Sequence, residues 1–384
     1  MRLVAGRGQN RRPLGRLGGR QVPARQVDHD DRAAVELVGA GRDRDRADAA
    51  IGEDGRRLEC SGSIVGGHEQ FHTRILAETP PGASMGLKLD TVLAMARTSP
   101  ARTGTARNGD CSLYFETFGD SADATLLLVN GLGSQCINYD EAWCAMFVDE
   151  GLHVVRFDNR DVGLSSHFPD APIATDGSAY SLLDMAADAV AVLDAVGVER
   201  AHVMGLSMGG MIVQQLAIHH RDRLRSMISV MSRTGERDSG HSTAEAYAHL
   251  TGASATDRES AITNHLAGQR IWGSPDHFDE QRLTTAAARA FDRAFDPGGV
   301  QRQFAAVGAA GSWADQLPGV TTPTLVIHGT ADTLIDISGG RRTAELIPGA
   351  TLVEIDGMGH DYPPVFQRRM VDEVAAFIRA IEAS

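Results

Sequence analysis

A serine stands at the centre of a five-residue segment that is bounded by glycines. Residues Gly205–Gly209 are Gly-Leu-Ser-Met-Gly. This segment begins at the end of the apolar run His202–Leu206 and is followed by the helix-prone run Met211–His219. A serine in a tight strand-to-helix turn needs small flanking residues, because the strained backbone leaves little room for side chains. Such a turn places the hydroxyl above the sheet edge, beside helix N-terminal amides that favour negative charge. Ser207 is therefore the predicted nucleophile.

Two later segments supply the groups that a serine nucleophile needs, because its hydroxyl is weak until a base removes the proton. Asp332 follows the apolar run Thr324–His328, and His360 follows the run Thr351–Ile355 on a glycine-containing loop. The chain order Ser207, Asp332, His360 is the Ser…Asp…His order of the α/β-hydrolase arrangement. We expect His360 to act as general base and then general acid, and Asp332 to orient its ring and stabilise the imidazolium.

Other residues compete for these roles. Asp336 and Asp361 are alternative acids, but neither lies in the first turn beyond a predicted strand. The chain has 14 histidines, and we interpret His219, His220 and His328 as surface or packing residues. Three sites that follow three separate strands in the required order favour Ser207, Asp332 and His360 as the triad.

A glycine turn could bind a developing negative charge. Residues 130–133 are Asn-Gly-Leu-Gly and follow the apolar run Thr125–Val129, so this turn should lie at the same sheet edge as Ser207. We expect the backbone amides of Leu132 and Met208 to form an oxyanion hole, in which one donor contributes about 3 kcal/mol. The alternative is an ordinary glycine turn.

The elements that position these residues alternate between strand and helix. Between the strands lie helical periods, one of which starts at the capping box Ser181–Asp184 and ends at Gly197. Such alternation predicts an α/β fold with a mostly parallel sheet and helices on both faces. The predicted strands are Leu113–Phe118, Thr125–Asn130, His153–Phe157, His202–Leu206, Met227–Met231, Thr324–His328 and Thr351–Ile355.

The composition divides the chain into four parts. Residues 1–84 are rich in Arg and lack apolar periodicity, which predicts a disordered extension or an over-extended gene start, with Met85 or Met95 as the true start. Residues 85–233 and 318–384 carry the strand and helix alternation of the core. Residues 234–317 are polar and helix-prone without convincing strands, which predicts a helical cap over the carboxyl edge of the sheet.

The overall composition excludes several classes of protein. The 384 residues include 37 basic and 50 acidic ones, a formal charge of −13, which argues against a nucleic-acid partner. No apolar stretch of about 18 residues predicts a membrane-spanning helix. The four cysteines show neither zinc-site nor disulfide-scaffold spacing, so we expect inert thiols and a cytoplasmic protein.

The motifs together resemble those of the α/β-hydrolase superfamily from about Cys111 to Ile381. The segments Arg156–Ser165 and Ala201–Gly209, and Gly357–His360 followed by a proline, are similar to the aclacinomycin methylesterase group of carboxylesterases. This resemblance implies hydrolysis of small to medium carboxylic esters through an acyl-serine, without a metal or an organic cofactor.

The resemblance also bears on other residues. It assigns Asp158 and Arg160 a bracing role in the turn after their strand. Many relatives have His-Gly where this chain has Asn130-Gly131, so the side chain that braces the anion-hole turn differs. Four aromatic residues of the predicted cap either line a pocket or pack between helices: Trp272, Phe278, Phe291 and Phe295.

Two other functions fit the same residues. Enol-lactone hydrolases share the Gly-Leu-Ser-Met-Gly-Gly stretch at Gly205–Gly210, so the substrate is either an ester or a lactone. A protein of a different class, a ligand receptor that hydrolyses slowly or not at all, would keep the same fold. The sequence does not determine the natural substrate or the oligomeric state.

Overall fold

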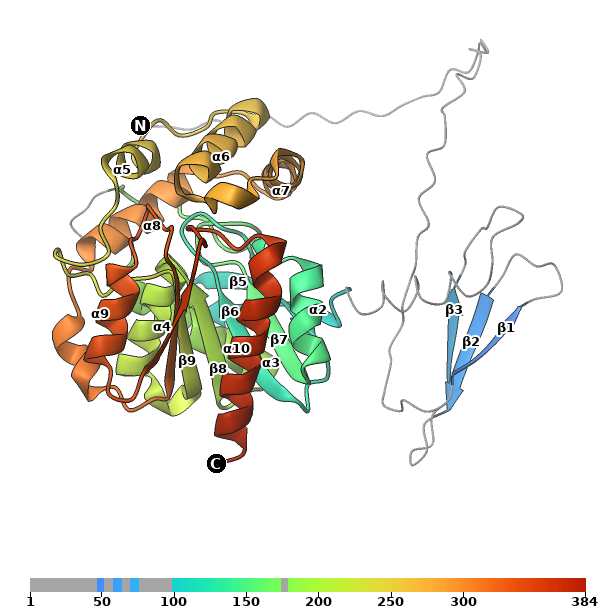
Figure 1. Cartoon of the computed structure of the whole chain (residues 1–384). Coiled ribbons are helices and arrows are strands. Elements are labelled where there is room, and N and C mark those ends of the chain that lie inside the picture. The colour runs from blue at the N-terminus through green and yellow to red at the C-terminus, as the bar shows by residue number, and fades with distance from the viewer. Residues whose placement is uncertain (1–46, 52–57, 64–69, 76–98, 174–178) are drawn as a thin grey trace, which may run out of the picture. The chain divides into compact units, whose positions relative to one another are not determined.

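The computed structural model describes residues 47–51, 58–63, 70–75, 99–173 and 179–384 (Figure 1). The chain divides into two units, Met1–Lys88 and Leu89–Ser384. In the first unit, an antiparallel sheet has the order β1-β2-β3, with the strands Ala47–Ile51, Leu58–Ser63 and Gln70–Ile75. These three strands are not among those that the sequence predicts. The expectation that residues 1–84 are disordered or precede the true start falls largely outside the described residues and stays a prediction.

An eight-stranded sheet forms the centre of the second unit, in the order β11-β10-β9-β8-β6-β7-β5-β4. Strand β5 pairs antiparallel with β4 and β7, and all other neighbours are parallel. The predicted α/β fold class with a mostly parallel sheet is therefore confirmed. The strands are β4 (Arg102–Asn108), β5 (Cys111–Phe118), β6 (Ala124–Val129), β7 (Leu152–Phe157), β8 (Ala201–Leu206), β9 (Leu224–Val230), β10 (Thr324–Gly329) and β11 (Thr351–Ile355).

Burial explains which strands the sequence predicts. Every residue of β8 is buried, as are all residues of β6 except Ala124. Strands that are covered on both faces form nearly continuous apolar runs, which are easily recognised. The edge strand β4 is mostly exposed, with only Ala106 buried, and its sequence has no apolar run. Strand β4 is therefore not among the strands that the sequence predicts.

Helices cover both faces of the sheet. Helices α3 (Leu182–Val196), α4 (Met208–His219) and α9 (Ser338–Leu346) pack on one face. On the other face lie α2 (Glu141–Asp149) and α10 (Pro364–Glu382), which Figure 1 shows side by side. Each face encloses its own cluster of buried apolar side chains. The sheet thus separates two hydrophobic cores and gives the loops at its edge a rigid base.

The predicted capping box and C-terminal stop of α3 are both confirmed. The Ser181 hydroxyl accepts a hydrogen bond from the Asp184 amide at 3.3 Å, and the Asp184 carboxylate accepts one from the Ser181 amide at 2.8 Å. These reciprocal bonds satisfy amides that have no partner in the first helical turn. At the other end Gly197 has φ 77°, the left-handed conformation that glycine adopts most readily.

Residues 234–317 form a helical insertion between β9 and β10, and the structure describes all of them. The insertion contains no strand, as predicted. Figure 1 shows α5, α6 and α7 together beyond one end of the sheet. Its helices are α5 (Ala244–Leu250), α6 (Arg258–Trp272), α7 (Glu280–Arg293) and α8 (Pro297–Ala309), with the short 3₁₀ helices η3 (Pro275–His277) and η4 (Ala314–Gly319).

Buried ion pairs join this insertion to the segment that follows β7. The Asp158 carboxylate lies 2.7 Å from the guanidinium of Arg293 in α7. The Asp161 carboxylate accepts two hydrogen bonds, at 2.8 and 2.9 Å, from Arg302 in α8. Both carboxylates have an exposed fraction of 0%. A buried charge is tolerated only when it is paired, so each aspartate requires its arginine.

The bracing role expected for Asp158 and Arg160 agrees with their hydrogen bonds. The Asp158 carboxylate accepts from the amides of Cys136 and Leu164, at 2.6 and 2.9 Å. The Arg160 guanidinium donates to both carboxylate oxygens of Asp188 in α3, at 2.6 and 2.7 Å. The turn after β7 is thereby tied to the core of the second unit.

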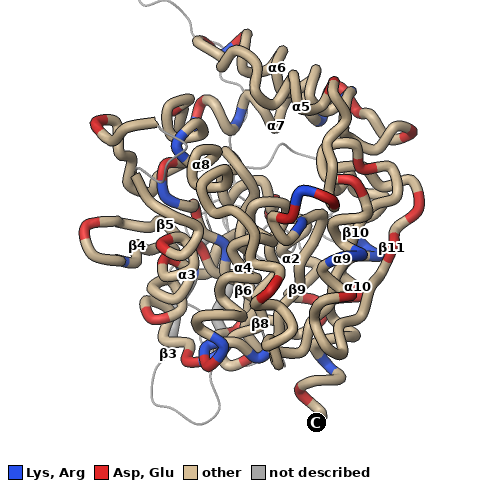
Figure 2. Tube along the Cα trace, turned by 90° about the vertical axis from the view of Figure 1, so that its left-hand side faces the viewer, with Lys and Arg blue, Asp and Glu red and all other residues tan. Residues whose placement is uncertain are grey.

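Acidic and basic side chains are mixed over the described part of the chain. Figure 2 shows arginine interspersed with Asp and Glu along the trace. Exposed pairs such as Arg258–Asp292, at 2.8 Å, contribute little to stability because water screens them. No helix among the described residues has both the length and the apolar character needed to cross a bilayer.

We expect Arg302→Met to lower the free energy of unfolding by about 3 kcal/mol, because it leaves the Asp161 carboxylate buried without a cation. The measurement is urea-induced unfolding followed by circular dichroism. Arg258→Met removes an arginine from an exposed pair in the same insertion and should leave the unfolding midpoint unchanged. Equal midpoints for the two variants would contradict the structural role of the buried pair.

Candidate active site

The turn at Ser207 connects β8 to α4 with a strained backbone. Ser207 has φ 55° and ψ −117°, and it is one of three described non-glycine residues with positive φ. Its amide donates to the Val230 carbonyl at 2.9 Å, and its carbonyl accepts from the Ser232 hydroxyl at 2.8 Å. These bonds to the neighbouring strand and the residues beyond it fix a conformation that would otherwise be unfavourable.

The glycines on either side of Ser207 are required by close packing. A Cβ atom on Gly205 would lie 2.1 Å from the Gly209 carbonyl oxygen. A Cβ atom on Gly209 would lie 2.2 Å from the Val129 carbonyl oxygen at the end of β6. Both distances are far below a van der Waals contact, so no larger residue fits. The expectation that this turn needs small flanking residues therefore has a definite steric cause.

The structure brings His360 and Asp332 to Ser207. His360 Nε2 lies 2.9 Å from Ser207 Oγ, and His360 Nδ1 lies 2.7 Å from Asp332 Oδ2. A carboxylate can only accept, so Nδ1 carries the proton and Nε2 is left to accept the Ser207 hydroxyl proton. Three loops that are far apart in the sequence thus form one continuous chain of hydrogen bonds.

Asp332 is held in place by further hydrogen bonds. Its Oδ1 accepts from the amides of Leu334 and Ile335, each at 2.9 Å. Burial by itself raises the pKa of Asp332, but the neighbouring imidazoles of His360 and His328 outweigh it and lower this pKa to about 2, from an ordinary 3.8. The carboxylate is therefore ionised at neutral pH. Its contribution to stability is fully present above about pH 4 and is lost as the pH falls towards 2.

His328 is buried, as the packing alternative of its interpretation expects, and it also contacts the acid of the predicted triad. It is fully buried, its Nε2–H donates to the Ile335 carbonyl at 2.8 Å, and the same nitrogen lies 3.4 Å from Asp332 Oδ2. His328 thus contacts the acid directly. Its position four residues before Asp332, near the end of β10, is the sequence signal that could have indicated this contact.

The two alternative acids have other partners. The Asp336 carboxylate accepts from the Ser338 amide at 2.9 Å. The Asp361 carboxylate accepts from the Ser274 amide at 2.9 Å and from the Ser274 hydroxyl at 2.5 Å. Neither carboxylate is hydrogen bonded to the His360 ring, so Asp332 remains the predicted acid.

The glycine turn after β6 lies beside Ser207. A Cβ atom on Gly131 would be 3.3 Å from Ser207 Cβ and 3.9 Å from Ser207 Oγ. In this turn the Ser134 amide donates to the Gly131 carbonyl at 3.2 Å and the Gly133 amide to Gln303 Oε1 at 2.8 Å. The Leu132 amide donates to no acceptor in the described part of the chain.

The Met208 amide belongs to the first turn of α4, where amides have no helical carbonyl partner. The amides of Leu132 and Met208 therefore donate to no acceptor in a helix or strand. Amides that stabilise a developing oxyanion need to be available in this way. Their role as an oxyanion hole stays a prediction. The side chain of Asn130 is buried, and neither of its polar atoms has a hydrogen-bond partner among the described residues.

The four aromatic residues of the insertion are packed against neighbours. The Phe291 and Phe295 rings lie 4.5 Å apart between centroids. The centroids of the Trp272 and His249 rings lie 5.3 Å apart, in an edge-to-face arrangement. The guanidinium of Arg270 lies 4.0 Å above the Phe278 ring. These contacts favour a packing role, while a role in substrate binding stays an open alternative.

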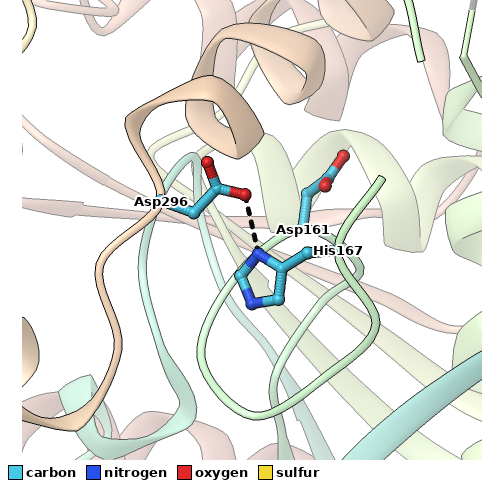
Figure 3. Close-up of side chains that lie close together, drawn as sticks. All are labelled: Asp161, His167 and Asp296. Atoms are coloured by element: carbon cyan, nitrogen blue, oxygen red, sulfur yellow. Dashed lines mark hydrogen bonds and ion pairs between the residues drawn. The ribbon is translucent and has the colours of Figure 1, made fainter. Parts of the chain in front are cut away.

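One group of residues has the side chains of a metal site. The ligand atoms of Asp161, His167 and Asp296 lie within 4.8 Å of one another (Figure 3). However, the Arg302 guanidinium already pairs with both carboxylates, and His167 Nδ1 lies 2.8 Å from Asp296 Oδ2. His167 Nε2 lies 3.1 Å from the Gly163 carbonyl. Because the Arg302 guanidinium already pairs with these carboxylates, the residues suit an ion-pair network better than a metal site.

Comparison with known proteins gives one family and several relatives. Residues 124–362 match the family described as alpha/beta hydrolase fold. The rhodomycin D methylesterase DnrP of Streptomyces peucetius is 30% identical over 298 residues, which cover 71% of this chain and 97% of that protein. The 3-oxoadipate enol-lactonase 2 of Acinetobacter baylyi is 27% identical over 281 residues, or 71% and 93% of the two chains.

The fold is also similar to solved structures. The esterase RhEst1 from Rhodococcus sp. superposes with a TM-score of 0.60 at 25% sequence identity. The alignment covers 73% of this chain and 99% of that one. The similarity therefore extends over essentially the whole of the solved chain.

We expect Asp332→Asn to slow the reaction of Ser207 with a fluorophosphonate probe by about 10⁴-fold. The two amides that donate to Oδ1 would keep the asparagine oxygen on their side, so its NH₂ group would face His360 Nδ1. That arrangement moves the ring proton to Nε2, which then cannot accept the Ser207 proton. The rate of labelling is followed by mass spectrometry of the intact protein.

The matched control is Asp336→Asn, which changes an aspartate that is bonded to Ser338 and not to the imidazole. The rate at which the fluorophosphonate probe labels this variant should stay within twofold of the rate for the unmodified protein. A similar loss in both variants would show that Asp332 has no special relation to His360.

Proposed function

The chain belongs to the α/β-hydrolase fold family, and on this premise we propose that it is a serine hydrolase that cleaves carboxylic esters of small to medium size. Ser207 is the nucleophile, His360 the general base and acid, and Asp332 the acid that orients the imidazole. The backbone amides of Leu132 and Met208 form the oxyanion hole. The observation that carries the proposal is the chain of hydrogen bonds from Ser207 through His360 to Asp332.

The first half of the reaction forms an acyl-serine. Ser207 Oγ attacks the ester carbonyl while His360 Nε2 takes the hydroxyl proton, and the carbonyl oxygen becomes negative. The amides of Leu132 and Met208 stabilise that oxygen, and Asp332 stabilises the imidazolium. When the intermediate collapses, the bond to the alcohol breaks and His360 returns the proton to the leaving alcohol oxygen.

The second half releases the acid. A water molecule attacks the acyl carbon, and His360 Nε2 takes one of its protons. The bond to Ser207 Oγ then breaks, and the serine oxygen recovers a proton from His360. The products are one carboxylic acid and one alcohol, and the enzyme returns to its starting state.

The helical insertion completes this proposed architecture. We take residues 85–233 and 318–384 as the two parts of the hydrolase core, and residues 234–317 as the cap. Hydrogen bonds from the insertion reach two loops of the site, since Gln303 accepts from the Gly133 amide and the Trp272 carbonyl accepts from the His360 amide. These contacts support a location over the carboxyl edge of the sheet.

A lactone is the second candidate substrate. It is an internal ester, so the same attack by Ser207 would open the ring and leave acid and alcohol in one molecule. The similarity to the 3-oxoadipate enol-lactonase 2 of Acinetobacter baylyi favours this possibility. The name of the Streptomyces peucetius relative, a methylesterase, favours a simple ester instead.

We expect Ser207→Ala to abolish hydrolysis of a short-chain aryl ester while circular dichroism and the thermal midpoint stay close to those of the unmodified protein. Without its hydroxyl the residue cannot form the acyl intermediate, so kcat should fall by a factor on the order of 10⁶. The release of the aryl alcohol is followed by absorbance. Undiminished turnover in this variant would remove Ser207 from the mechanism.

A wider panel separates the remaining functions. The full-length protein is tested on aryl esters of increasing acyl length and on a set of lactones, with Ser207→Ala as the blank. Faster turnover of lactones than of every open ester would favour the lactonase. Stoichiometric fluorophosphonate labelling without turnover of any substrate would favour a ligand receptor.

A further inference from the structure

The end of helix α6 is hydrogen bonded to the loop that carries His360. The His360 amide donates to the Trp272 carbonyl at 2.6 Å. The Ser274 hydroxyl accepts from the Gly359 amide at 3.0 Å and donates to the Asp361 carboxylate at 2.5 Å. All three residues of the segment Gly359–Asp361 are therefore bonded to the short segment Trp272–Ser274.

The same end of α6 contacts the loop that carries the acid. Thr333, which follows Asp332, donates its hydroxyl proton to the Ile271 carbonyl at 2.8 Å. Residues 271–274 thus lie against both late loops of the triad. A shift of this segment would change the position of Asp332 and His360 together.

The two segments pack too closely for independent movement. A Cβ atom on Gly359 would lie 2.4 to 2.5 Å from backbone atoms of Gly273 and Trp272. Ser274 has an exposed fraction of only 3%. Burial also raises the pKa of Asp361, although its hydrogen bonds with Ser274 oppose this effect. The polar groups of this contact are therefore bonded to each other across two closely packed segments.

The His360 loop needs such support. Gly357 has φ 73°, and a second glycine immediately precedes the histidine, so the local sequence restricts the backbone weakly. Proton transfer between Ser207 Oγ and His360 Nε2 depends on a separation near their present 2.9 Å. A misplacement of about 1 Å can lower a rate by about 10²-fold.

We propose that Ser274 is a positioning residue of the insertion, which keeps His360 within reach of Ser207 by bonding the backbone before it and the carboxylate after it. The inference rests on the proposed serine hydrolase function. Ser274 acts through the His360 loop and has no contact with Ser207. It links the helical insertion to the triad, so the insertion contributes to the chemical step as well as to substrate access.

We expect Ser274→Ala to lower kcat for a short-chain aryl ester by about 10- to 100-fold while KM stays within twofold. Substrate binding is unchanged because the hydroxyl faces the loop, whereas proton transfer suffers from the displaced imidazole. Ser274→Cys keeps an unbranched side chain of two heavy atoms but replaces the hydroxyl with a larger thiol, a weak donor and acceptor, so it should show the same split. If Ser274→Ala does not fold, Ser274→Cys tests the positioning role of the hydroxyl in its place.

Two further variants make the test specific. Ser260→Ala removes a hydroxyl in the first turn of α6, at the end of this helix that lies away from Ser274. The Ser260 hydroxyl is hydrogen bonded only to residues 256 and 257, so this variant should leave kcat and KM unchanged. Asp361→Ala should reduce kcat like Ser274→Ala, and the double variant should lose much less than the product of the two factors, because both changes break one shared contact.

The outcomes distinguish this inference from the proposed function. If the unmodified protein and Ser207→Ala are equally inactive on every ester and lactone, the proposed function fails. If Ser207→Ala is inactive while Ser274→Ala and Ser274→Cys retain full kcat, only the positioning role is wrong. A rise in KM without a fall in kcat, or an equal loss in Ser260→Ala, would likewise overturn it.

Discussion

The left-handed backbone of Ser207 is the constraint on which the rest of the site depends. A non-glycine residue in such a conformation costs on the order of 1–3 kcal/mol, so the surrounding structure has to impose it. The packing of Gly205 and Gly209 against backbone carbonyls closes the turn, and hydrogen bonds to Val230 and Ser232 fix it. The result is a hydroxyl that projects from the end of β8, where the imidazole of His360 can reach it.

The helical insertion contributes to the geometry of this site through contacts from α6 and α8. The end of α6 bonds the backbone of His360, and in α8 Gln303 bonds the Gly133 amide of the predicted oxyanion turn. Beside it, Arg302 neutralises the buried Asp161 carboxylate in the segment after β7. Since the sheet fixes only the ends of its strands, the loops beyond them take their final positions from these contacts. The positions of these loops therefore depend on both the sheet and the helical insertion.

Much of this arrangement is visible in the chain itself, because it follows from local rules. Buried parallel strands appear as continuous apolar runs, and the segment Gly205–Gly209, which begins in the last two residues of β8, predicts the turn at Ser207. The carboxyl ends of parallel strands meet at one edge, so the order Ser207, Asp332, His360 already indicates which side chains converge. The exposed strand β4 lacks such a signal, since one face of an edge strand needs no apolar residues.

The sequence by itself determined the fold class, the strained turn and the residue types of the predicted triad. Only the tertiary structure decided which partners complete the site. Asp161 and Arg302 are 141 residues apart, and Ser274 and Asp361 are 87 apart. No periodicity links such distant side chains, because their contact depends on how the helical insertion packs on the finished sheet. His328 is only four residues from Asp332, but their contact still requires the loop after β10 to fold back on its own strand.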